Sequence, residues 1–309
     1  MSRYKEELNL AADLIKNASK ITEWFRKEGF QSFQKQDESP VTLADYASQI
    51  FIISKLKEYF PEDQIITEEE DSVFVDKKAI EVIMECFNSL NLEKIGNIKQ
   101  IISYRGSPSK RQWTIDPIDG TKGFQKGLSY AIGISLMVQS ELCVGAIGIP
   151  NYDERGKAIF VAEKGQGAKS SYGENEFILI KISNQKNLKK ARFLHSLHYD
   201  QPWTLKFIDI AGITDRIQMD SMGKFCKVAD GTADIYLRPI NYQPYSWDYC
   251  PGDLILREAG GKVTDLNGNG IKYENERCLL PTPGFLASNG ILHSEVLNII
   301  NKNNLFDNI

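Results

Sequence analysis

The sequence predicts a mixed α+β / α/β fold in two parts, a first half built on an antiparallel sheet and a second half in which strands and helices alternate. Between residues 112 and 165, four apolar or alternating runs are separated only by turn residues, which is typical of antiparallel strands. After residue 190, short strands alternate with helical patterns, as in an α/β domain. The polar stretch SNQKNLKK lies between them, so we expect domains over residues 1–185 and 186–309.

Two helices are expected to open the first half. Residues 4–27 carry apolar side chains at helical spacing along one face, and Gly29 follows as a stop. In VTLADYASQIFIISKLKEYFP, Thr42 is the expected N-cap, and Pro61 ends the helix. DQIITEEED is a short apolar strand that runs into acidic residues, and residues 72–104 are expected to form an amphipathic insertion with a helix in KKAIEVIMECFNSL.

The sheet of the first half is predicted from the runs QWTID, YAIGISLMVQ, LCVGAIGIP and KAIFVAEKG, of which the second and third indicate a hairpin. In the second half, helices are expected in SMGKFCKVADGTA and CPGDLILREAGG. The strands expected between and beyond these helices are ARFLHS, RIQMD, DIYLR, KVTDL and FLASN.

Composition and charge exclude several classes of protein. A hydrophobic content of 42%, a charged content of 25% and a net charge of −4 are those of a soluble globular protein without the basic surplus of a nucleic-acid binder. The five cysteines are irregularly spaced and form no CxxC pair, which favours free thiols in a reducing compartment. No stretch resembles a signal peptide or a transmembrane helix. We therefore expect a cytoplasmic monomer that binds neither nucleic acid nor membrane.

Four acidic groups fall where strand ends or helix starts should bring them to one end of the fold: Glu68, Asp116, Asp119 and Asp248. Hard divalent cations such as Mg²⁺ prefer oxygen ligands and share them with substrate phosphates. In DPIDGTKGF the proline is expected to stop the strand, so that a turn aims both aspartates and the Ile118 carbonyl at one spot. This pattern predicts a metal site.

The residues after this strip suggest what the metal would act on. Gly120 and Thr121 stand at an apparent helix start, where free backbone N–H groups can cradle a phosphate. Metals beside a phosphate cradle indicate metal-assisted transfer of a phosphoryl group to water.

Each motif also has a purely structural interpretation. Taken alone, DPIDG is a turn signal, and the acidic run at residues 68–70 would usually be solvated. Asp45 follows Thr42 at the spacing of a capping box, so it could merely hold a helix end. The order in which the motifs occur together along the chain favours the functional interpretation.

DPIDGTKGF together with WDYCPGDLILREAGG resembles the lithium-sensitive, magnesium-dependent phosphatase superfamily, which includes inositol monophosphatases and fructose-1,6-bisphosphatases. Within it, Lys122-Gly123-Phe124 after the DGT triplet resembles the 3′(2′),5′-bisphosphate nucleotidases. The match runs from SPVTLADYASQ to FLASNG and is weakest in the insertion. The resemblance implies a five-layered αβαβα sandwich, two or three Mg²⁺ ions and inhibition by Li⁺.

The resemblance also implies roles for single residues. Asp45 and Thr121 would orient and deprotonate the attacking water, and the N–H groups of Gly120 and Thr121 would hold the scissile phosphate. The metal ligands would be Glu68, Asp116, the Ile118 carbonyl, Asp119 and Asp248.

The stretch MDSMGKFCKVADGTADIYLRPI resembles the nucleotide-binding part of the same nucleotidases. The residues that it implies for the nucleotide and for the phosphate that is not cleaved are Ser221, Gly223, Lys224 and Arg238, with Asp248 also touching substrate. FLHSLHYD resembles a segment whose first histidine packs against the base, so His195 and Ser196 are candidates and His198 is a weaker one. As structural alternatives, Lys224 would be a solvated helix lysine, Arg238 a surface strand residue and His195 a strand-end histidine.

We therefore predict Mg²⁺-dependent hydrolysis of the 3′-phosphate of adenosine 3′,5′-bisphosphate to AMP and phosphate, with 3′-phosphoadenylyl sulfate as a second substrate. The nearest alternative is an inositol polyphosphate 1-phosphatase acting on inositol 1,4-bisphosphate, alone or as a second activity. A more remote alternative is a non-catalytic nucleotide-binding regulator. The intact acidic set argues against the regulator, because clustered carboxylates repel one another when no metal neutralises them.

Overall fold

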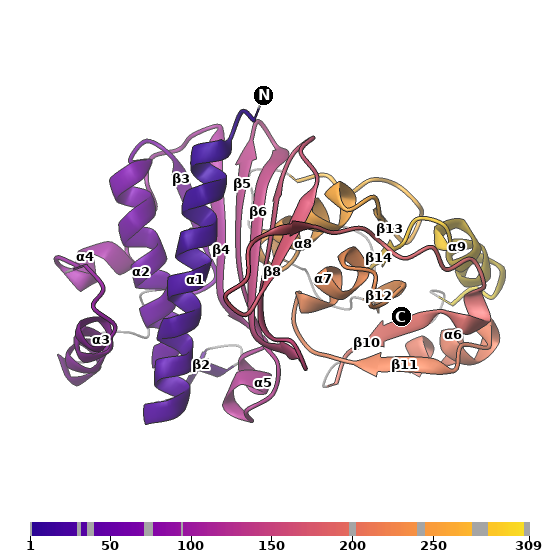
Figure 1. The fold of residues 1–309 in the computed structure, drawn as a ribbon, viewed down its shortest axis with the longest axis horizontal. Helices are drawn as coiled ribbons and strands as arrows, with labels where there is room; N and C mark the ends of the chain where they lie inside the picture. The colour runs from indigo at the N-terminus through magenta and orange to yellow at the C-terminus, as the bar shows by residue number, and fades with distance from the viewer. Residues whose placement is uncertain are drawn as a thin grey trace.

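Five layers of secondary structure make up the molecule in the computed structural model, which describes residues 2–29, 32–35, 40–70, 77–93, 95–197, 202–239, 245–273 and 284–305. From left to right in Figure 1, a pair of long helices, a seven-stranded sheet, two shorter helices, a five-stranded sheet and two outer helices follow one another. Three clusters of buried apolar side chains fill the spaces between these layers. The αβαβα fold class that the resemblance implied is confirmed.

The first sheet has the strand order β3-β4-β5-β6-β7-β8-β9. β3 and β4 are parallel, and the other neighbouring strands are antiparallel. Gln139 and Ser140, which join β5 to β6, both have positive φ, so the predicted hairpin is confirmed. The strands are β3 (Gln64–Thr67), β4 (Arg111–Asp119), β5 (Ala131–Val138), β6 (Glu141–Asp153), β7 (Gly156–Glu163), β8 (Ala168–Tyr172) and β9 (Ile178–Leu179).

β4 does not stop at Pro117, and this expectation was wrong. Its pairing with β5 is interrupted after Asp116 and resumes where Asp119 faces Ala131, so the strand bulges and continues. A bulge accommodates a proline because the extra residue needs no ladder hydrogen bond. In a regular strand, two residues three positions apart point to opposite faces. The bulge breaks that alternation, which allows Asp116 and Asp119 to share one cluster.

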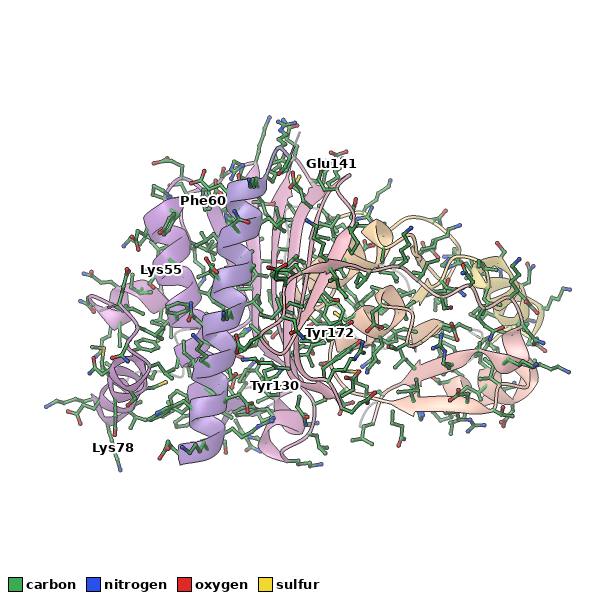
Figure 2. The ribbon with its side chains drawn as sticks, viewed as in Figure 1. Lys55, Phe60, Lys78, Tyr130, Glu141 and Tyr172 are labelled. Carbon is green, nitrogen blue, oxygen red and sulfur yellow. The ribbon has the colours of Figure 1, made fainter. Side chains whose placement is uncertain are left out.

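Helices α1 (Lys5–Glu28) and α2 (Leu43–Tyr59) cover the outer face of the first sheet (Figure 1). The hydroxyl of Tyr130, labelled in Figure 2, hydrogen-bonds to Thr22 (2.7 Å) and Glu23 (2.8 Å) of α1 and so joins this helix to the sheet. The predicted insertion contains α3 (Lys77–Ser89) and α4 (Ile98–Ile102). β1 (Ser32–Gln34) and β2 (Pro40–Thr42) form a separate antiparallel pair before α2.

The middle layer consists of α7 (Gly223–Ala229) and α8 (Ser246–Glu258). α8 lies very close to the first sheet at Pro251. A Cβ on Gly145 would come within 2.9 Å of the Pro251 carbonyl oxygen, and one on Gly133 within 2.5 Å of the Met222 sulfur. Glycine is therefore required at position 145 for α8 to pack at this depth, whereas the clash at Gly133 is with the end of a flexible side chain just before α7.

The second sheet has the strand order β11-β10-β12-β14-β13. β10 is parallel to both of its neighbours, so β10, β11 and β12 end at one common edge. Helices α6 (Pro202–Ala211) and α9 (His293–Lys302) cover the outer face (Figure 1). All five predicted strands are confirmed: β10 (Arg192–His195), β11 (Asp215–Gln218), β12 (Ile235–Pro239), β13 (Lys262–Asp265) and β14 (Gly284–Ser288). The division into domains at residue 185 stays a prediction.

None of the helices in the described part of the chain is long and apolar enough to cross a membrane. Four cysteines, Cys86, Cys143, Cys226 and Cys250, are buried free thiols. Cys278 lies outside the described residues.

Candidate active site

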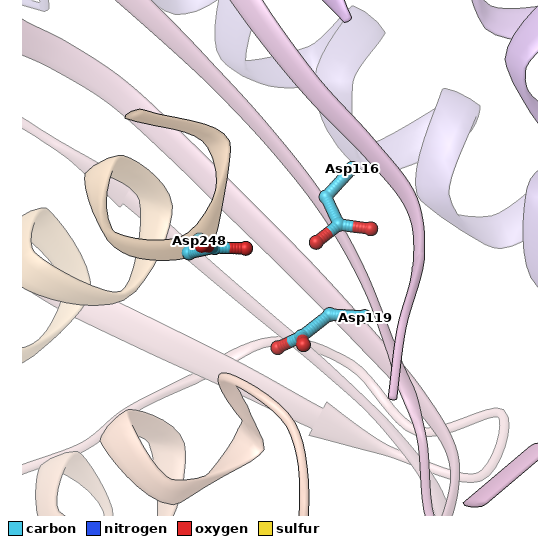
Figure 3. Close-up of side chains that lie close together, drawn as sticks. All are labelled: Asp116, Asp119 and Asp248. Carbon is cyan, nitrogen blue, oxygen red and sulfur yellow. The ribbon is translucent and has the colours of Figure 1, made fainter. Parts of the chain in front are cut away.

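Three carboxylates from distant parts of the sequence meet between the first sheet and α8 (Figure 3). Asp116 and Asp119 come from the bulged end of β4, and Asp248 comes from the first turn of α8. One oxygen of each residue lies within 4.8 Å of the others. The acidic cluster, as we call these three residues, confirms that the predicted aspartates come together.

Burial among like charges makes these carboxylates hard to ionise without a counter-charge. Burial raises the pKa of Asp119 to about 6, against the opposing effects of Lys224 and Arg238. Burial and then the charge of Asp119 raise the pKa of Asp248 to about 7. Burial, and then the charges of Glu68, Asp119 and Asp248, hold the pKa of Asp116 well above its ordinary value. A bound cation would relieve this repulsion.

The donor set suits a hard divalent metal ion. Within the described residues, Asp116 Oδ1 is buried and has no hydrogen-bond partner, which is costly for a carboxylate oxygen unless something else coordinates it. Carboxylate and carbonyl oxygens are the ligands that Mg²⁺ prefers. The Ile118 carbonyl accepts a hydrogen bond from the Thr121 hydroxyl at 3.1 Å, which ties this fourth candidate ligand to the start of α5 (Thr121–Gln125).

Glu68 lies outside the acidic cluster but next to Asp116, and Lys35 pairs with it. The Lys35 ammonium lies 2.9 Å from Glu68 and 2.7 Å from Glu69. Burial opposes the charged form of Lys35, but the two glutamates outweigh it and raise the pKa of this lysine. Glu69 is only 1% exposed and Glu68 is half-buried, so the solvated surface that the structural interpretation expected is confined to Glu70. The charge of Glu68 still acts on Asp116 and raises its pKa.

Asp45 makes the contacts expected of a helix cap and also the contact expected of a partner of Thr121, and it uses a different oxygen for each. Its Oδ2 accepts from the Thr42 N–H (2.8 Å) and the Thr42 hydroxyl (2.5 Å), and the Thr42 hydroxyl accepts from the Ala44 N–H (3.2 Å). The capping box is therefore confirmed. Asp45 Oδ1 accepts a longer hydrogen bond from the Thr121 hydroxyl, at 3.4 Å. Burial raises the pKa of Asp45 to about 7.

Gly120 links the acidic cluster to the second half of the chain. Its φ of +92° is in the region that favours glycine, and it precedes Thr121 as the N-cap of α5. A Cβ there would lie 3.5 Å from the Cβ of Ser221. Ser221 itself has a φ of +76°, and the following Met222 N–H donates to the Asp119 carboxylate.

Two cationic side chains border the acidic cluster, and neither fits its structural alternative. Lys224 is only 4% exposed, donates to the Met219 carbonyl at 2.8 Å and lies 5.0 Å from the centre of the Tyr236 ring. It is therefore no solvated helix lysine. Arg238, at the end of β12, is half-buried, and its charge lowers the pKa of both Asp119 and Asp248, so it acts on the acidic cluster and is no isolated surface residue.

His195 and Ser196 lie at the carboxyl end of β10, at the edge shared by the parallel strands. His195 is 6% exposed, and its carbonyl accepts from the Met219 N–H at 3.1 Å. Gly223 begins α7, and its N–H donates to the Ser221 hydroxyl at 3.2 Å. His198 lies outside the described residues.

Sequence reasoning missed Lys35, Glu69 and Asp220. Lys35 and Glu69 belong to polar stretches that carry no periodic signal, and only the fold brings them together. Asp220 accepts hydrogen bonds from Ser196 and Leu197, at the edge where the candidate nucleotide residues gather. Its position directly before Ser221 in the MDS triplet was the available signal.

Comparison with known proteins places this chain among phosphatases. The model of the inositol monophosphatase family matches residues 4–304. The 3′(2′),5′-bisphosphate nucleotidase of Emericella nidulans is 32% identical, over 97% of this chain and 98% of the relative. The enzyme of the same name from Schizosaccharomyces pombe is 33% identical over 92% of each chain.

Solved structures show the same fold. The IMPase of Thermotoga maritima matches with a TM-score of 0.71 and 22% sequence identity, over 96% of this chain and 97% of that one. The inositol monophosphatase from Anabaena matches with a TM-score of 0.68 and 21% identity, over 96% of each. With the family match spanning nearly all residues and relatives above 30% identity, the chain belongs to the inositol monophosphatase family.

Proposed function

We propose that this protein is a Mg²⁺-dependent 3′(2′),5′-bisphosphate nucleotidase that hydrolyses the 3′-phosphate of adenosine 3′,5′-bisphosphate to AMP and phosphate. The observation that carries the proposal is the meeting of the acidic cluster with Lys224 and Arg238. A substrate with two phosphates needs one place where metal-assisted chemistry occurs and another where a phosphate is only held. The names of the relatives in three organisms support the same substrate class.

Asp45 and Thr121 are the residues that we assign to the proton of the attacking water. The Thr121 hydroxyl has a single hydrogen, for which the Ile118 carbonyl at 3.1 Å and the Asp45 carboxylate at 3.4 Å compete. With the Ile118 carbonyl bound to a cation, this hydrogen would turn to Asp45, and the oxygen would keep its lone pairs to accept from a water molecule. With a pKa raised to about 7 by burial, the Asp45 carboxylate is a stronger base than an exposed aspartate. Its other oxygen stays bound to Thr42, which fixes the orientation of the group.

The proposed metal ligands are those of the acidic cluster, with Glu68 and the Ile118 carbonyl. When bound, two or three Mg²⁺ ions would supply water of lowered pKa and neutralise charge on the phosphate. The N–H groups of Gly120 and Thr121 are the proposed contacts of the scissile phosphate.

The remaining candidates are assigned to the part of the substrate that does not react. Lys224 and Arg238 would hold the 5′-phosphate, since cationic side chains shielded from solvent in part or in full bind phosphate strongly. The base would lie against His195 and Ser196. Ser221 and Gly223, at the start of α7, would contact the part of the nucleotide between the base and the 5′-phosphate. Asp248 would contact both metal and substrate.

Phosphate release from adenosine 3′,5′-bisphosphate, with and without Mg²⁺ and with AMP identified as the product, tests the proposal. Release should require Mg²⁺ and stop when a chelator is in excess. Undiminished release in excess chelator would refute the metal mechanism. Inositol 1,4-bisphosphate in the same assay decides the nearest alternative, and tight nucleotide binding without turnover would identify the regulator.

Further properties belong to the same proposal. Li⁺ should inhibit, and 3′-phosphoadenylyl sulfate should be a second substrate, which would give the enzyme a place in sulfur metabolism. We also propose that the protein acts in the cytoplasm as a monomer, without nucleic-acid or membrane partners, and the buried free thiols support a reducing compartment.

A further inference from the structure

We propose that Ser196 and Asp220 select adenine over 6-oxopurines, an inference that rests on the proposed nucleotide substrate. Ser196 directly follows β10, and Asp220 lies two residues beyond the end of the neighbouring parallel strand, β11. In α/β sheets, ligands bind outside the carboxyl ends of parallel strands. Both residues therefore stand where the nucleotide would enter.

One carboxylate oxygen organises the segment after β10. Asp220 Oδ1 accepts from the Ser196 hydroxyl at 2.8 Å and from the Leu197 N–H at 2.9 Å, and the residue is only 7% exposed. An ionised carboxylate has no hydrogen to give, so the serine hydroxyl must be the donor in this pair. Its single hydrogen is used there. Toward a ligand, the Ser196 oxygen can then act only as an acceptor.

The direction of this hydrogen bond discriminates between purine bases. Adenine presents an amino group at position 6, which donates, whereas hypoxanthine and guanine present a carbonyl there, which accepts. An acceptor oxygen pairs with the amino group and leaves the carbonyl without a donor. The negative charge behind Ser196 strengthens the preference, because it attracts the amino hydrogens and repels a carbonyl oxygen.

The negative charge of Asp220 also determines whether the base or the phosphate can lie beside it. A phosphate next to Asp220 would be repelled, whereas Lys224 and Arg238 attract it. The phosphate therefore belongs beside these cations, and an uncharged base is the group that suits the Ser196 position.

Turnover of adenosine 3′,5′-bisphosphate and inosine 3′,5′-bisphosphate tests the inference, since the two differ only at position 6 and the adjoining ring nitrogen. The parent enzyme should favour the adenosine compound in kcat/KM by about ten- to a hundredfold. Ser196→Ala should lower this ratio, because alanine has no acceptor. Asp220→Ala should bring the ratio close to one, because it removes the negative charge and leaves the Ser196 hydroxyl hydrogen free to turn toward the ligand. The change should appear in KM more than in kcat.

Asp234→Ala is the matched control. Like Asp220, Asp234 accepts from a serine hydroxyl and from a backbone N–H, but it lies at the opposite end of β10 and also pairs with the Arg192 guanidinium. This variant should lose stability but keep the adenosine preference. If the role of Asp220 were merely structural, the Asp220 variant should keep the preference as well.

Equal use of both nucleotides by the parent enzyme would overturn the inference and leave the proposed function standing. A preference that is as large in Ser196→Ala and Asp220→Ala as it is in Asp234→Ala would overturn the inference as well. Turnover of neither nucleotide would overturn the proposed function and the inference together.

Discussion

The side chain of Asp45 serves two neighbours at once. Its Oδ2 closes the cap of α2 with Thr42, while its Oδ1 faces the Thr121 hydroxyl. The two interpretations that the sequence left open therefore describe different oxygens of one buried group. A substitution that removes the whole carboxyl group would mix an effect on helix stability with an effect on chemistry.

Asp45→Asn should keep the fold and lose turnover. The amide oxygen can still accept from the Thr42 N–H, so the free energy of unfolding should change by less than about 2 kcal/mol, the upper value of a complete cap. The amide cannot take up a proton, so kcat should fall by about 10²- to 10⁴-fold. Thermal melts and phosphate release measure the two effects.

Thr42→Ala is the control for this prediction. It removes the acceptor for the Ala44 N–H, so it should lower the melting temperature while turnover falls far less than in Asp45→Asn. A stable Asp45→Asn variant with near-normal turnover would make Asp45 a cap and remove it from the mechanism.

Lys224→Ala should change substrate preference more than it changes chemistry. A charge-assisted hydrogen bond is worth about 1.5–3 kcal/mol, so kcat/KM for adenosine 3′,5′-bisphosphate should fall about ten- to a hundredfold more than for adenosine 3′-monophosphate. Arg238→Ala should act in the same direction. Lys227→Ala is the control, because Lys227 lies on the same helix but pairs with Asp153 at 2.8 Å. Equal loss on both substrates would mean that Lys224 is structural.

At the scale of elements, the start of β4 could be predicted from the sequence, but its end could not. The run QWTID predicted a strand, and the proline after it predicted an end, but the strand continues through a bulge to Asp119. Local pattern cannot reveal a bulge, because the partner strand decides whether pairing resumes. The two-residue β9 and the outer helices α6 and α9 were not predicted either, while the long periodic α1 was predicted closely.

The first residue of α9, His293, is buried with both ring nitrogens bonded. Nε2 lies 2.9 Å from the Thr264 hydroxyl, and Nδ1 lies 2.9 Å from the Ser288 hydroxyl. Thr264 gives its own hydrogen to the Asp265 carbonyl at 2.7 Å, so Nε2 must carry the proton and Nδ1 accepts. Burial lowers the pKa of His293 to about 4. The ring is therefore neutral in the folded protein at neutral pH.

This histidine should make stability depend on pH. The unfolded chain, with a pKa near 6.5, binds the proton more tightly than the folded protein, so stability is present above pH 6.5 and is lost as the pH falls toward 4. The loss should be about 2 kcal/mol at pH 5. Urea unfolding at pH 7 and pH 5 measures it. His293→Gln should lack this part of the slope, and an identical pH dependence in both proteins would contradict the assignment.

At the scale of the whole molecule, the acidic cluster exists only when the layers assemble. Asp116 and Asp119 stand on the first sheet, and Asp248 stands on α8. The sequence identified these residues because their motifs occur in a recognisable order. It could not identify Lys35 or Asp220, because each acts through partners that the fold brings to it and has no motif of its own.

Mg²⁺ should stabilise the folded protein as a whole. A ligand that binds only the folded state at a hundred times its Kd adds about 2.7 kcal/mol, which raises the melting temperature measurably. Asp248→Asn should shrink this increase. Asp253→Asn is the control, since Asp253 is another buried aspartate of α8 but is bonded to Tyr273 at 2.6 Å, away from the acidic cluster. A melting temperature that is the same in Mg²⁺ and in chelator would contradict the metal site.

The close approach of α8 to the first sheet has a consequence for protein engineering. Any side chain at Gly145 would push Pro251 outward, and Asp248 would move with the same helix, away from Asp116. In a mutational library selected for turnover, Gly145 would therefore rank among the least tolerant positions, although it acts through packing. A ranking by tolerance alone would mistake this glycine in the middle of a sheet for a substrate contact.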